Sequence, residues 1–281
     1  MKNIVVVPNV LKDRAFEITD TVVTKLLDLG FNVFVSASVK YERKGVFLYE
    51  KMPIEIDLII VVGGDGSVID ASIDAIERNI PILGVNLGKV GYLAEVEPHN
   101  IDLLDRLSTG DYSIMSKMLL SAEFGNTSDF SDRYAVNDVV ISREGLLHIA
   151  DIKIEDSIGN SMKIRADGVI LSTPQGSTAY SFSTGGPIVA HNVESILLTP
   201  ISPHSFFNRS VLFNSSDVIK VTNCGELPVS VNIDGRCAKQ LAPAEVCEIR
   251  KAPVSFKMLT FTENNMFSSL FKKMRILGDI G

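Results

Sequence analysis

Short apolar runs alternate with amphipathic stretches over the first third of the chain. Apolar runs at 4–7, 31–35, 56–62 and 80–85 predict strands, and Asp57 is the one interruption of the third run. Continuous apolar runs are typical of parallel strands that are covered on both faces. Apolar residues at helical spacing predict helices at 15–29, 68–78 and 101–107. This alternation predicts an α/β domain with an open, mostly parallel sheet over residues 1–115.

After about residue 115 the pattern changes to strict alternation of apolar and polar positions. Every second residue of 148–155, beginning with His148, lies on one face of a predicted strand, and 229–233 alternates in the same way. Further strands are predicted at 134–141, 246–250 and 254–261. Such strands are typical of antiparallel sheets, so we expect an all-β domain over residues 116–260. Helical spacing returns at 265–275, and residues 261–281 are expected to pack back on the first domain.

Composition agrees with two domains and narrows the class of protein. At about 150 residues per domain, 281 residues suggest two domains. Apolar residues make up 46% and charged residues 22%, which are ordinary globular values and exclude a disordered chain. Lysine and arginine number 27 against 34 aspartate and glutamate, a net charge of −7. A broad basic surface for nucleic acid or an anionic membrane is therefore not expected.

The sequence also bears on location and redox state. No stretch approaches the ~18 apolar residues of a membrane span, and the apolar run near Met1 is too short for the core of a signal peptide. The three cysteines, Cys224, Cys237 and Cys247, lack the number and spacing of a disulfide framework or a zinc site. We therefore expect a soluble cytoplasmic protein with reduced thiols.

Residues 63–67, with the sequence Gly-Gly-Asp-Gly-Ser, form a predicted turn between a strand and a helix. Such a turn lets backbone N–H groups approach a phosphate, and the helix N-terminus favours an anion. The Asp65 carboxylate repels phosphate unless it binds a divalent cation or accepts a proton from an attacking hydroxyl. The structural alternative is that Asp65 caps the helix. The turn lacks both the lysine of a P-loop and the third glycine of the dinucleotide fingerprint, so any nucleotide is held in another way.

Three further segments carry candidate chemistry. Residues 167–181 are dense in hydroxyl side chains, which suit a sugar or phosphate but also an ordinary polar loop. Residues 86–93 follow a strand and are spaced with glycine, as a binding loop or a plain loop can be. Asn137 and Asp138 interrupt an apolar strand, so their polar groups need partners. A ligand with hydroxyls or an adenine edge supplies such partners, and a bulge or strand end is the alternative.

Taken together, these segments resemble the NAD kinase family, whose members transfer a phosphoryl group to the 2′-hydroxyl of the adenosine ribose of NAD. The matching segments follow the family order: 63–67, 86–93, 137–138, 167–183, 202–209 and 232–235. The Gly-Gly-Asp-Gly turn is shared with diacylglycerol and sphingosine kinases and, more distantly, with phosphofructokinases. Ser-Thr-Pro at 172–174, followed by Gly-Ser-Thr-Ala-Tyr at 176–180, is more specific. The resemblance implies a Rossmann-like α/β domain, a β-sandwich domain, and a C-terminal segment that returns to the first domain.

The resemblance also implies roles for individual residues. Asp65 matches the family's proton acceptor, and the turn that holds the phosphoryl donor corresponds to Gly63, Gly64, Gly66 and Ser67. The positions that match NAD-binding residues of the family are Asp65, Gly66, Tyr92, Asn137, Asp138, His148, Arg165, Asp167, Thr178, Ala179, Tyr180 and Ser183. Asn137 and Asp138 match an Asn-Glu pair that binds the adenosine part, with the shorter aspartate here. Gln175 and Arg236 differ from the family's commoner Thr and Gln, which leaves their roles open.

The resemblance implies ATP as donor, Mg²⁺ as the expected divalent cation, and a homodimer or homotetramer; no residue is assigned to the metal. One alternative is a lipid kinase of the diacylglycerol or sphingosine type, which needs a membrane-facing surface. The sequence contains neither a basic amphipathic helix nor an apolar insertion loop. Another alternative is a non-catalytic NAD(P) sensor on the same fold, to which an acid beside phosphates contributes little.

Overall fold

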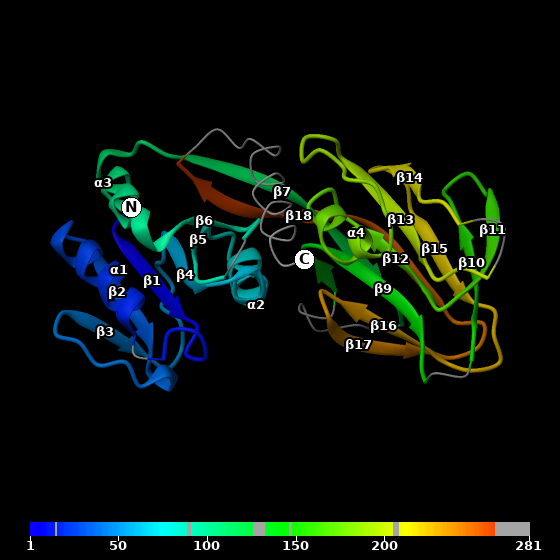
Figure 1. Cartoon of the computed structure of the whole chain (residues 1–281), viewed down its shortest axis with the longest axis horizontal. Coiled ribbons are helices and arrows are strands. Elements are labelled where there is room, and N and C mark those ends of the chain that lie inside the picture. Colours follow the sequence, from blue (N-terminus) through cyan, green and yellow to red (C-terminus); the bar gives the residue numbers. More distant parts are fainter. Residues whose placement is uncertain (15, 89–90, 126–132, 146–147, 205–207, 262–281) are drawn as a thin grey trace, which may run out of the picture. The chain divides into compact units, whose positions relative to one another are not determined.

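A computed structural model describes residues 1–14, 16–88, 91–125, 133–145, 148–204 and 208–261, and the chain forms two compact units (Figure 1). Met1–Ser116, with the stretch that begins at Phe256, forms the first unit, and Lys117–Ser255 forms the second. Phe261 packs in the core of the first unit, where Arg106 Nη1 donates to its carbonyl at 2.6 Å. The helix predicted at 265–275 lies outside the described residues.

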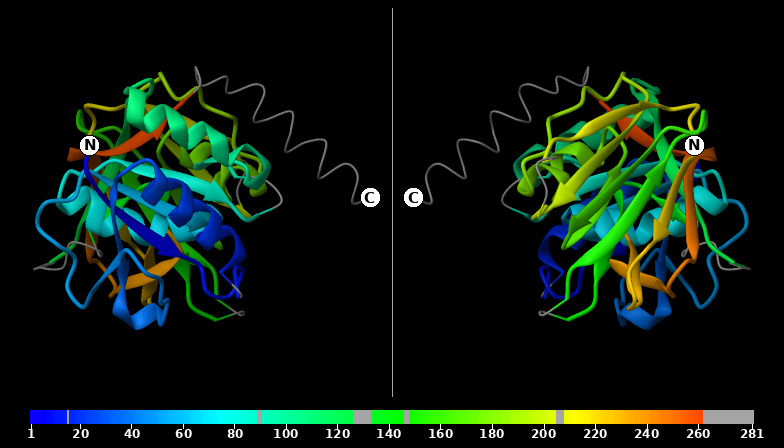
Figure 2. Two further views of the ribbon diagram at one scale, coloured as in Figure 1. Left: turned by 90° about the vertical axis from the view of Figure 1, so that its left-hand side faces the viewer. Right: turned by 90° about the vertical axis from the view of Figure 1, so that its right-hand side faces the viewer.

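The first unit is built on a parallel sheet, coloured blue to cyan in Figures 1 and 2. Its strands are β1 (Asn3–Pro8), β2 (Asn32–Ser36), β3 (Val46–Tyr49), β4 (Leu58–Gly63), β5 (Ile82–Asn86) and β6 (Ala94–Val96). The order is β5-β4-β1-β2-β3 with every pair parallel, and β6 adds to β5. The four predicted strands are confirmed as β1, β2, β4 and β5. The sequence pattern missed β3 and β6 because they are too short to show a period.

Helices cover the parallel sheet. They are α1 (Glu17–Asp28), α2 (Asp65–Glu77) and α3 (Arg106–Thr109), with the 3₁₀ helices η1 (Ala37–Val39) and η2 (Pro98–Asp105). All of β4 is buried: residues 58, 60 and 62 share a core cluster with Val22 and Leu26 of α1, and Ile59 lies on the other face near α2. Burial on both faces explains the continuous apolar run. Because β1 and β4 are parallel neighbours, the loops that follow them lie at one edge of the sheet.

The second unit is a β-sandwich (Figure 1). One antiparallel sheet has the order β14 (Val211–Asn214), β13 (Ser195–Ile201), β12 (Gly168–Ser172), β9 (Asp138–Arg143), β16 (Val229–Ile233) and β17 (Arg236–Leu241). The other contains β11 (Ser161–Ala166), β10 (Ala150–Glu155), β15 (Ile219–Asn223), β8 (Tyr134–Ala135) and most of β18 (Val246–Thr260) and β7 (Ser113–Glu123). The end of β18 from Phe256 and the start of β7 up to Ser116 belong to the first unit. Val139 and Leu171 of the first sheet share one buried cluster with Ile152 and Val221 of the second. Two sheets closed over one apolar layer define the sandwich.

Four predicted strands are present with different bounds. The two strands predicted at 246–250 and 254–261 are one strand, β18, in which Pro253 lies between the segment paired with β15 and the segment that reaches β5. The strand predicted at 134–141 is broken at residues 136–137 into β8 and β9. The strand predicted from His148 begins at Ala150, and His148 is exposed. Short helical turns, η3 (Gly176–Thr178) and α4 (Tyr180–Ser183), follow β12.

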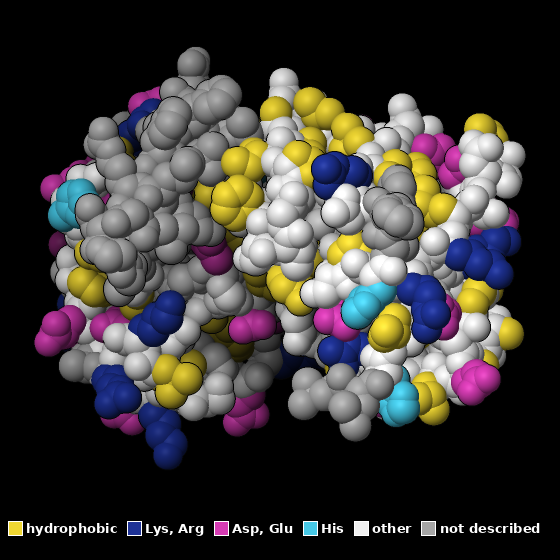
Figure 3. All heavy atoms as spheres, turned by 45° about the vertical axis from the view of Figure 1, so that its right-hand side comes forward, with side chains coloured by type: hydrophobic (Ala, Val, Ile, Leu, Met, Phe, Trp, Pro, Cys, Tyr) yellow, Lys and Arg dark blue, Asp and Glu magenta, His cyan; other side chains and the backbone are white. Residues whose placement is uncertain are grey.

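The described surface has no broad basic area on the face drawn in Figure 3, as the net charge of −7 led us to expect. On the face drawn in Figure 3, basic and acidic side chains are interspersed among the described residues. In the part of the chain that the structure describes, no helix is long and apolar enough to cross a membrane. Cys224, Cys237 and Cys247 are free, and burial raises the pKa of the Cys247 thiol to about 12.

Candidate active site

The turn 63–67 joins β4 to α2 and forms the first part of the site. An ideal Cβ on Gly63 lies 2.6 Å from Cβ and Oγ of Ser67, so only glycine fits there. An ideal Cβ on Gly66 meets nothing within 4 Å, and this glycine is exposed, so a ligand can approach its backbone. The first N–H groups of a helix have no partner within the helix, and the helix dipole is positive at that end. The turn can therefore bind a phosphate.

Asp65 is the first residue of α2, and its carboxylate accepts two backbone hydrogen bonds. Tyr92 N donates to Oδ2 at 2.9 Å, and Leu93 N donates to Oδ1 at 3.0 Å. The alternative in which Asp65 caps the helix is wrong, because the N-cap is Gly64 and no side chain caps α2. Burial, together with the charge of Asp65, raises the pKa of the neighbouring Tyr92. The carboxylate thus has a fixed orientation and retains lone pairs that can accept a proton.

A lysine that the sequence pattern did not single out lies at the same turn. Lys12 Nζ is 2.8 Å from the position of an ideal Cβ on Gly64. Its loop is organised by Asn9, whose Oδ1 accepts from Lys12 N at 3.1 Å and whose Nδ2 donates to Ser67 Oγ at 2.7 Å. In a P-loop the lysine belongs to the turn itself. Here the ammonium group is that of Lys12, in the loop after β1. Lys12 lies near the turn because β1 and β4 are neighbouring strands, and no local motif shows this pairing.

In the second unit, the break between β8 and β9 is held by a hairpin turn. The Asp234 carboxylate accepts from the N–H groups of Val136 at 2.7 Å, Asn137 at 2.8 Å and Asp138 at 3.1 Å. Asp234 and Gly235 have φ values of 47° and 81° in the two-residue turn between β16 and β17. A side chain therefore takes the place of strand partners for three successive N–H groups, which explains why the predicted strand is interrupted.

Four predicted NAD-binding residues line one hollow of about 450 Å³ in this unit: Asn137, Asp138, Ala179 and Tyr180. Asp138 is 5% exposed, and burial raises the pKa of its carboxyl to about 7, with the charge of Asp234 adding to the shift. A buried carboxyl with a strongly raised pKa in the wall of a hollow is typical of a functional site. The structure therefore brings the proposed adenosine pair together with part of the hydroxyl-rich segment.

Within the hydroxyl-rich segment, three hydroxyl side chains at 173–178 form hydrogen bonds to nearby backbone carbonyls. Thr173 Oγ1 donates to the carbonyl of residue 136 at 2.7 Å. The hydroxyls of Ser177 and Thr178 donate to carbonyls three residues earlier, at 2.7 and 3.1 Å. In the structure these three hydroxyls bond nearby backbone, as short polar side chains often do. Their contacts with a sugar or phosphate stay a prediction. Thr178 is 5% exposed, whereas Ser183 is exposed.

Gly176 of this segment packs directly on the backbone that carries the adenosine pair. An ideal Cβ at Gly176 lies 2.0 Å from Asn137 O, and a backbone atom cannot rotate away. We expect Gly176→Ala to lower the free energy of unfolding by about 3 kcal/mol, measured by urea denaturation. Gly66→Ala, where the added methyl group meets no atom within 4 Å, is the stability control. Equal stability of the two variants would contradict this packing.

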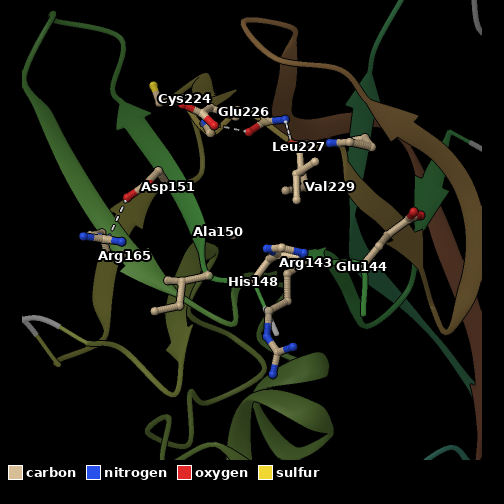
Figure 4. A pocket seen from close by; sticks show the side chains of 14 residues that line it. Arg143, Glu144, His148, Ala150, Asp151, Arg165, Cys224, Glu226, Leu227 and Val229 are labelled. Atoms are coloured by element: carbon tan, nitrogen blue, oxygen red, sulfur yellow. Dashed lines mark hydrogen bonds and ion pairs between the residues drawn. The ribbon is translucent and has the colours of Figure 1, made fainter. Parts of the chain in front are cut away.

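Two further predicted residues line a second hollow, of about 460 Å³ (Figure 4). His148 and Arg165 line it, and Arg165 Nε pairs with Asp151 Oδ1 at 3.1 Å. Asp167 Oδ1 pairs with Nε of Arg143, another lining residue, at 2.6 Å, and this arginine holds the pKa of Asp167 below its ordinary value. Six predicted NAD-binding residues of the second unit therefore divide between these two hollows. Asp167, Thr178 and Ser183 line neither of them.

Sequence reasoning missed Lys12, Arg143 and the role of Asp234 as an acceptor for three N–H groups. Asp234-Gly235 between two alternating segments is a hairpin signal that could have located the turn. Burial raises the pKa of Asp234, and the three backbone hydrogen bonds and the charge of Arg236 offset only part of that rise. The role of Arg236 itself was left open by the sequence. Gln175 is buried, with its carbonyl accepting from Thr178.

The fold and these features define a nucleotide-binding class: a parallel α/β unit with a phosphate-binding type of turn, followed by a β-sandwich with polar hollows. The ATP-NAD kinase N-terminal domain matches residues 4–112, and the ATP-NAD kinase C-terminal domain matches residues 136–261. The NAD kinase of Caldanaerobacter subterraneus subsp. tengcongensis is 34% identical, over 98% of this chain and 99% of the relative. That of Lachnoclostridium phytofermentans is also 34% identical, over 97% and 99%. The chain therefore belongs to the NAD kinase family, and it is a kinase.

Solved structures agree with this fold. The crystal structure of yeast NADH kinase complexed with NADH has a TM-score of 0.83 at 22% identity, covering 96% of this chain and 86% of that chain. An NAD kinase from Archaeoglobus fulgidus in complex with ATP has a TM-score of 0.72 at 25% identity, covering 97% and 98%. Family membership favours an enzyme acting on NAD over the lipid kinase and the sensor considered from the sequence.

Proposed function

We propose that the chain transfers the terminal phosphoryl group of ATP to the 2′-hydroxyl of the adenosine ribose of NAD, with Asp65 as the proton acceptor. The observation that carries this proposal is the Asp65 carboxylate, which Tyr92 N and Leu93 N hold at the start of α2 beside a glycine-rich turn. ATP in the Archaeoglobus fulgidus structure supports ATP as the donor. The products are NADP and ADP.

The chemistry follows from these groups. A ribose hydroxyl is a poor nucleophile at neutral pH, and Asp65 takes its proton as the new P–O bond forms and the bond to ADP breaks. The backbone N–H groups of the turn, with Lys12, hold the donor phosphates and offset the charge that develops on them. General base catalysis of this kind contributes roughly 10²–10⁴-fold. Positioning of donor and acceptor supplies the remaining acceleration.

A divalent cation, with Mg²⁺ expected, completes this proposal. Mg²⁺ is usually bound by one or two carboxylates and by substrate phosphates. Because Asp65 is proposed as the base, the donor phosphates are the proposed ligands and no residue of this chain is assigned to the cation. Among the residues described, no group of three or more His, Cys, Asp and Glu side chains is arranged to hold a metal ion. When bound, the cation would neutralise part of the charge on the donor phosphates.

Most of the residues proposed to recognise NAD belong to the second unit. Asn137 and Asp138 are proposed to bind the adenosine part, where an ionised Asp138 accepts hydrogen bonds. His148, Arg165 and Asp167 are proposed to serve the nicotinamide half. A homodimer or homotetramer is proposed from the family resemblance, and light scattering coupled to gel filtration measures that assembly.

One experiment separates this proposal from its alternatives. The purified protein is incubated with Mg²⁺ and either ATP or polyphosphate, crossed with NAD or NADH, and product is read with an NADP-specific dehydrogenase after oxidation where needed. We expect NADP from NAD and ATP. Binding of NAD in calorimetry without turnover would instead support the sensor. If NAD is neither bound nor turned over, NAD is not the substrate.

A further inference from the structure

A hollow of about 440 Å³ in the first unit lies beside the phosphate turn and has no role in the function proposed so far. It is bounded by the loop after β1, the end of β3 and one face of α2, and all of these belong to the first unit. Its volume is within the range of small-molecule sites, roughly 300–1,000 Å³.

The hollow is continuous with the turn. Ser67, the last residue of the turn, is part of its wall, and so is Asn9, whose Nδ2 donates to Ser67 Oγ at 2.7 Å. Asn9 also orients Leu11 and Lys12 by accepting from their N–H groups at 3.0 and 3.1 Å. A ligand with its phosphates on the turn can therefore extend directly into this hollow.

The lining is suited to a flat, neutral ring with polar edges. Leu11 is 77% exposed, and Tyr49 and Met52 add further apolar surface to the same hollow. Asp70 and Asp74 of α2 offer carboxylate oxygens, which accept hydrogen bonds from ring amino groups and repel a further phosphate. Burial and the charge of Asp74 both raise the pKa of Tyr49, so its hydroxyl stays protonated at neutral pH. Apolar walls with acceptors at the edge match a purine base.

We propose that this hollow holds the purine base of the phosphoryl donor, while Lys12 and the turn hold its phosphates. The proposal rests on the proposed function, because it takes the turn as the donor site. It assigns donor specificity to the loop after β1 and the exposed face of α2. The donor base and the acceptor NAD are then recognised by different residues.

The test fills the hollow without altering the turn. Ala71 lies on α2 in the wall, and Ala71→Phe places a ring where the base is proposed to lie. We expect the KM for ATP, at saturating NAD, to rise at least ~10-fold, with the KM for NAD unchanged. Inorganic tripolyphosphate, which has no base, is the probe of the turn, and its inhibition constant against ATP should stay unchanged.

A milder variant covers the case in which Ala71→Phe fails to fold. Asp74→Asn keeps the shape of the wall and removes one charged acceptor, so the KM for ATP should rise by about 5–10-fold. Glu77→Gln, an exposed carboxylate-to-amide change at the end of the same helix, is the matched control and should leave that KM unchanged. Circular dichroism and melting temperature confirm that each variant is folded.

Two results would overturn the proposal. An unchanged KM for ATP in folded Ala71→Phe and Asp74→Asn means that no base occupies the hollow. If the KM for ATP and the inhibition constant of tripolyphosphate rise together, the substitution has disturbed phosphate binding and not a base site. A wild-type protein that makes no NADP is a failure of the proposed function instead. Calorimetric titration of the wild type and Ala71→Phe with ATP and with tripolyphosphate then tests separately whether the hollow holds the base. Weaker binding of ATP alone supports the proposal, and unchanged binding of ATP or equal weakening of both ligands contradicts it.

Discussion

Asp65→Asn lowers the turnover number for NADP formation by roughly 10²–10⁴-fold, because an amide cannot accept the proton of the attacking hydroxyl. The amide keeps one acceptor oxygen for the Tyr92 and Leu93 N–H groups, so the loss of stability is limited to about 1–3 kcal/mol. The measurement is a coupled assay at saturating ATP and NAD, with chemical denaturation of the same sample.

The control for this prediction is Asp28→Asn, the same change at an exposed position at the end of α1. It should leave turnover unchanged and alter the free energy of unfolding by less than about 1 kcal/mol. Near-native turnover in a folded Asp65→Asn protein would remove Asp65 as the base. A large rise in the KM for ATP with little loss of turnover would assign Asp65 to donor binding instead.

Asp138→Asn is expected to stabilise the protein at pH 8 while weakening its hold on NAD. The pKa of Asp138 rises from an ordinary 3.8 to about 7 in the folded protein, so folding disfavours the ionised carboxylate. The wild type therefore loses stability as the pH rises from about 4 to 7, by up to roughly 4 kcal/mol from this group. The amide does not ionise, so the variant should match the wild type at pH 4 and exceed it at pH 8.

The same substitution should raise the KM for NAD by about 10-fold or more at pH 8, because a charged acceptor is replaced by a neutral one. In the wild type, kcat/KM for NAD should increase as the pH passes about 7, and this step should be absent from the variant. Urea denaturation at pH 4 and pH 8, with NAD kinetics, measures both effects. A variant that is less stable than the wild type at pH 8 contradicts the buried-charge explanation.

The strand and helix pattern predicted most of the first unit because β1, β4 and β5 are buried almost throughout and are continuous apolar runs in the sequence. It failed where long-range contacts override the local pattern. The strand predicted at 134–141 is apolar enough to be continuous, yet Asp234, almost 100 residues later, takes three of its N–H groups. The gap between the strands predicted at 246–250 and 254–261 is also absent, because β18 runs through it.

At the candidate site, too, the sequence motifs located individual residues but not the contacts between residues that are far apart in the sequence. The motifs located Asp65 and Tyr92 separately, but only the structure shows the hydrogen bond between them. Lys12 carries no motif and reaches the turn because β1 and β4 are neighbours. Composition alone does not show that the hydroxyls of Thr173 and Ser177 bond to nearby carbonyls, which the structure shows.

The most direct test of the central claim identifies the product and the position of its new phosphate. The purified protein is incubated with NAD, ATP and Mg²⁺, and the product is examined by phosphorus and proton NMR. The account predicts one NADP per ADP formed, with the phosphate on the 2′-oxygen of the adenosine ribose. Consumption of ATP without a phosphate on that oxygen, or phosphorylation at another hydroxyl, would contradict it.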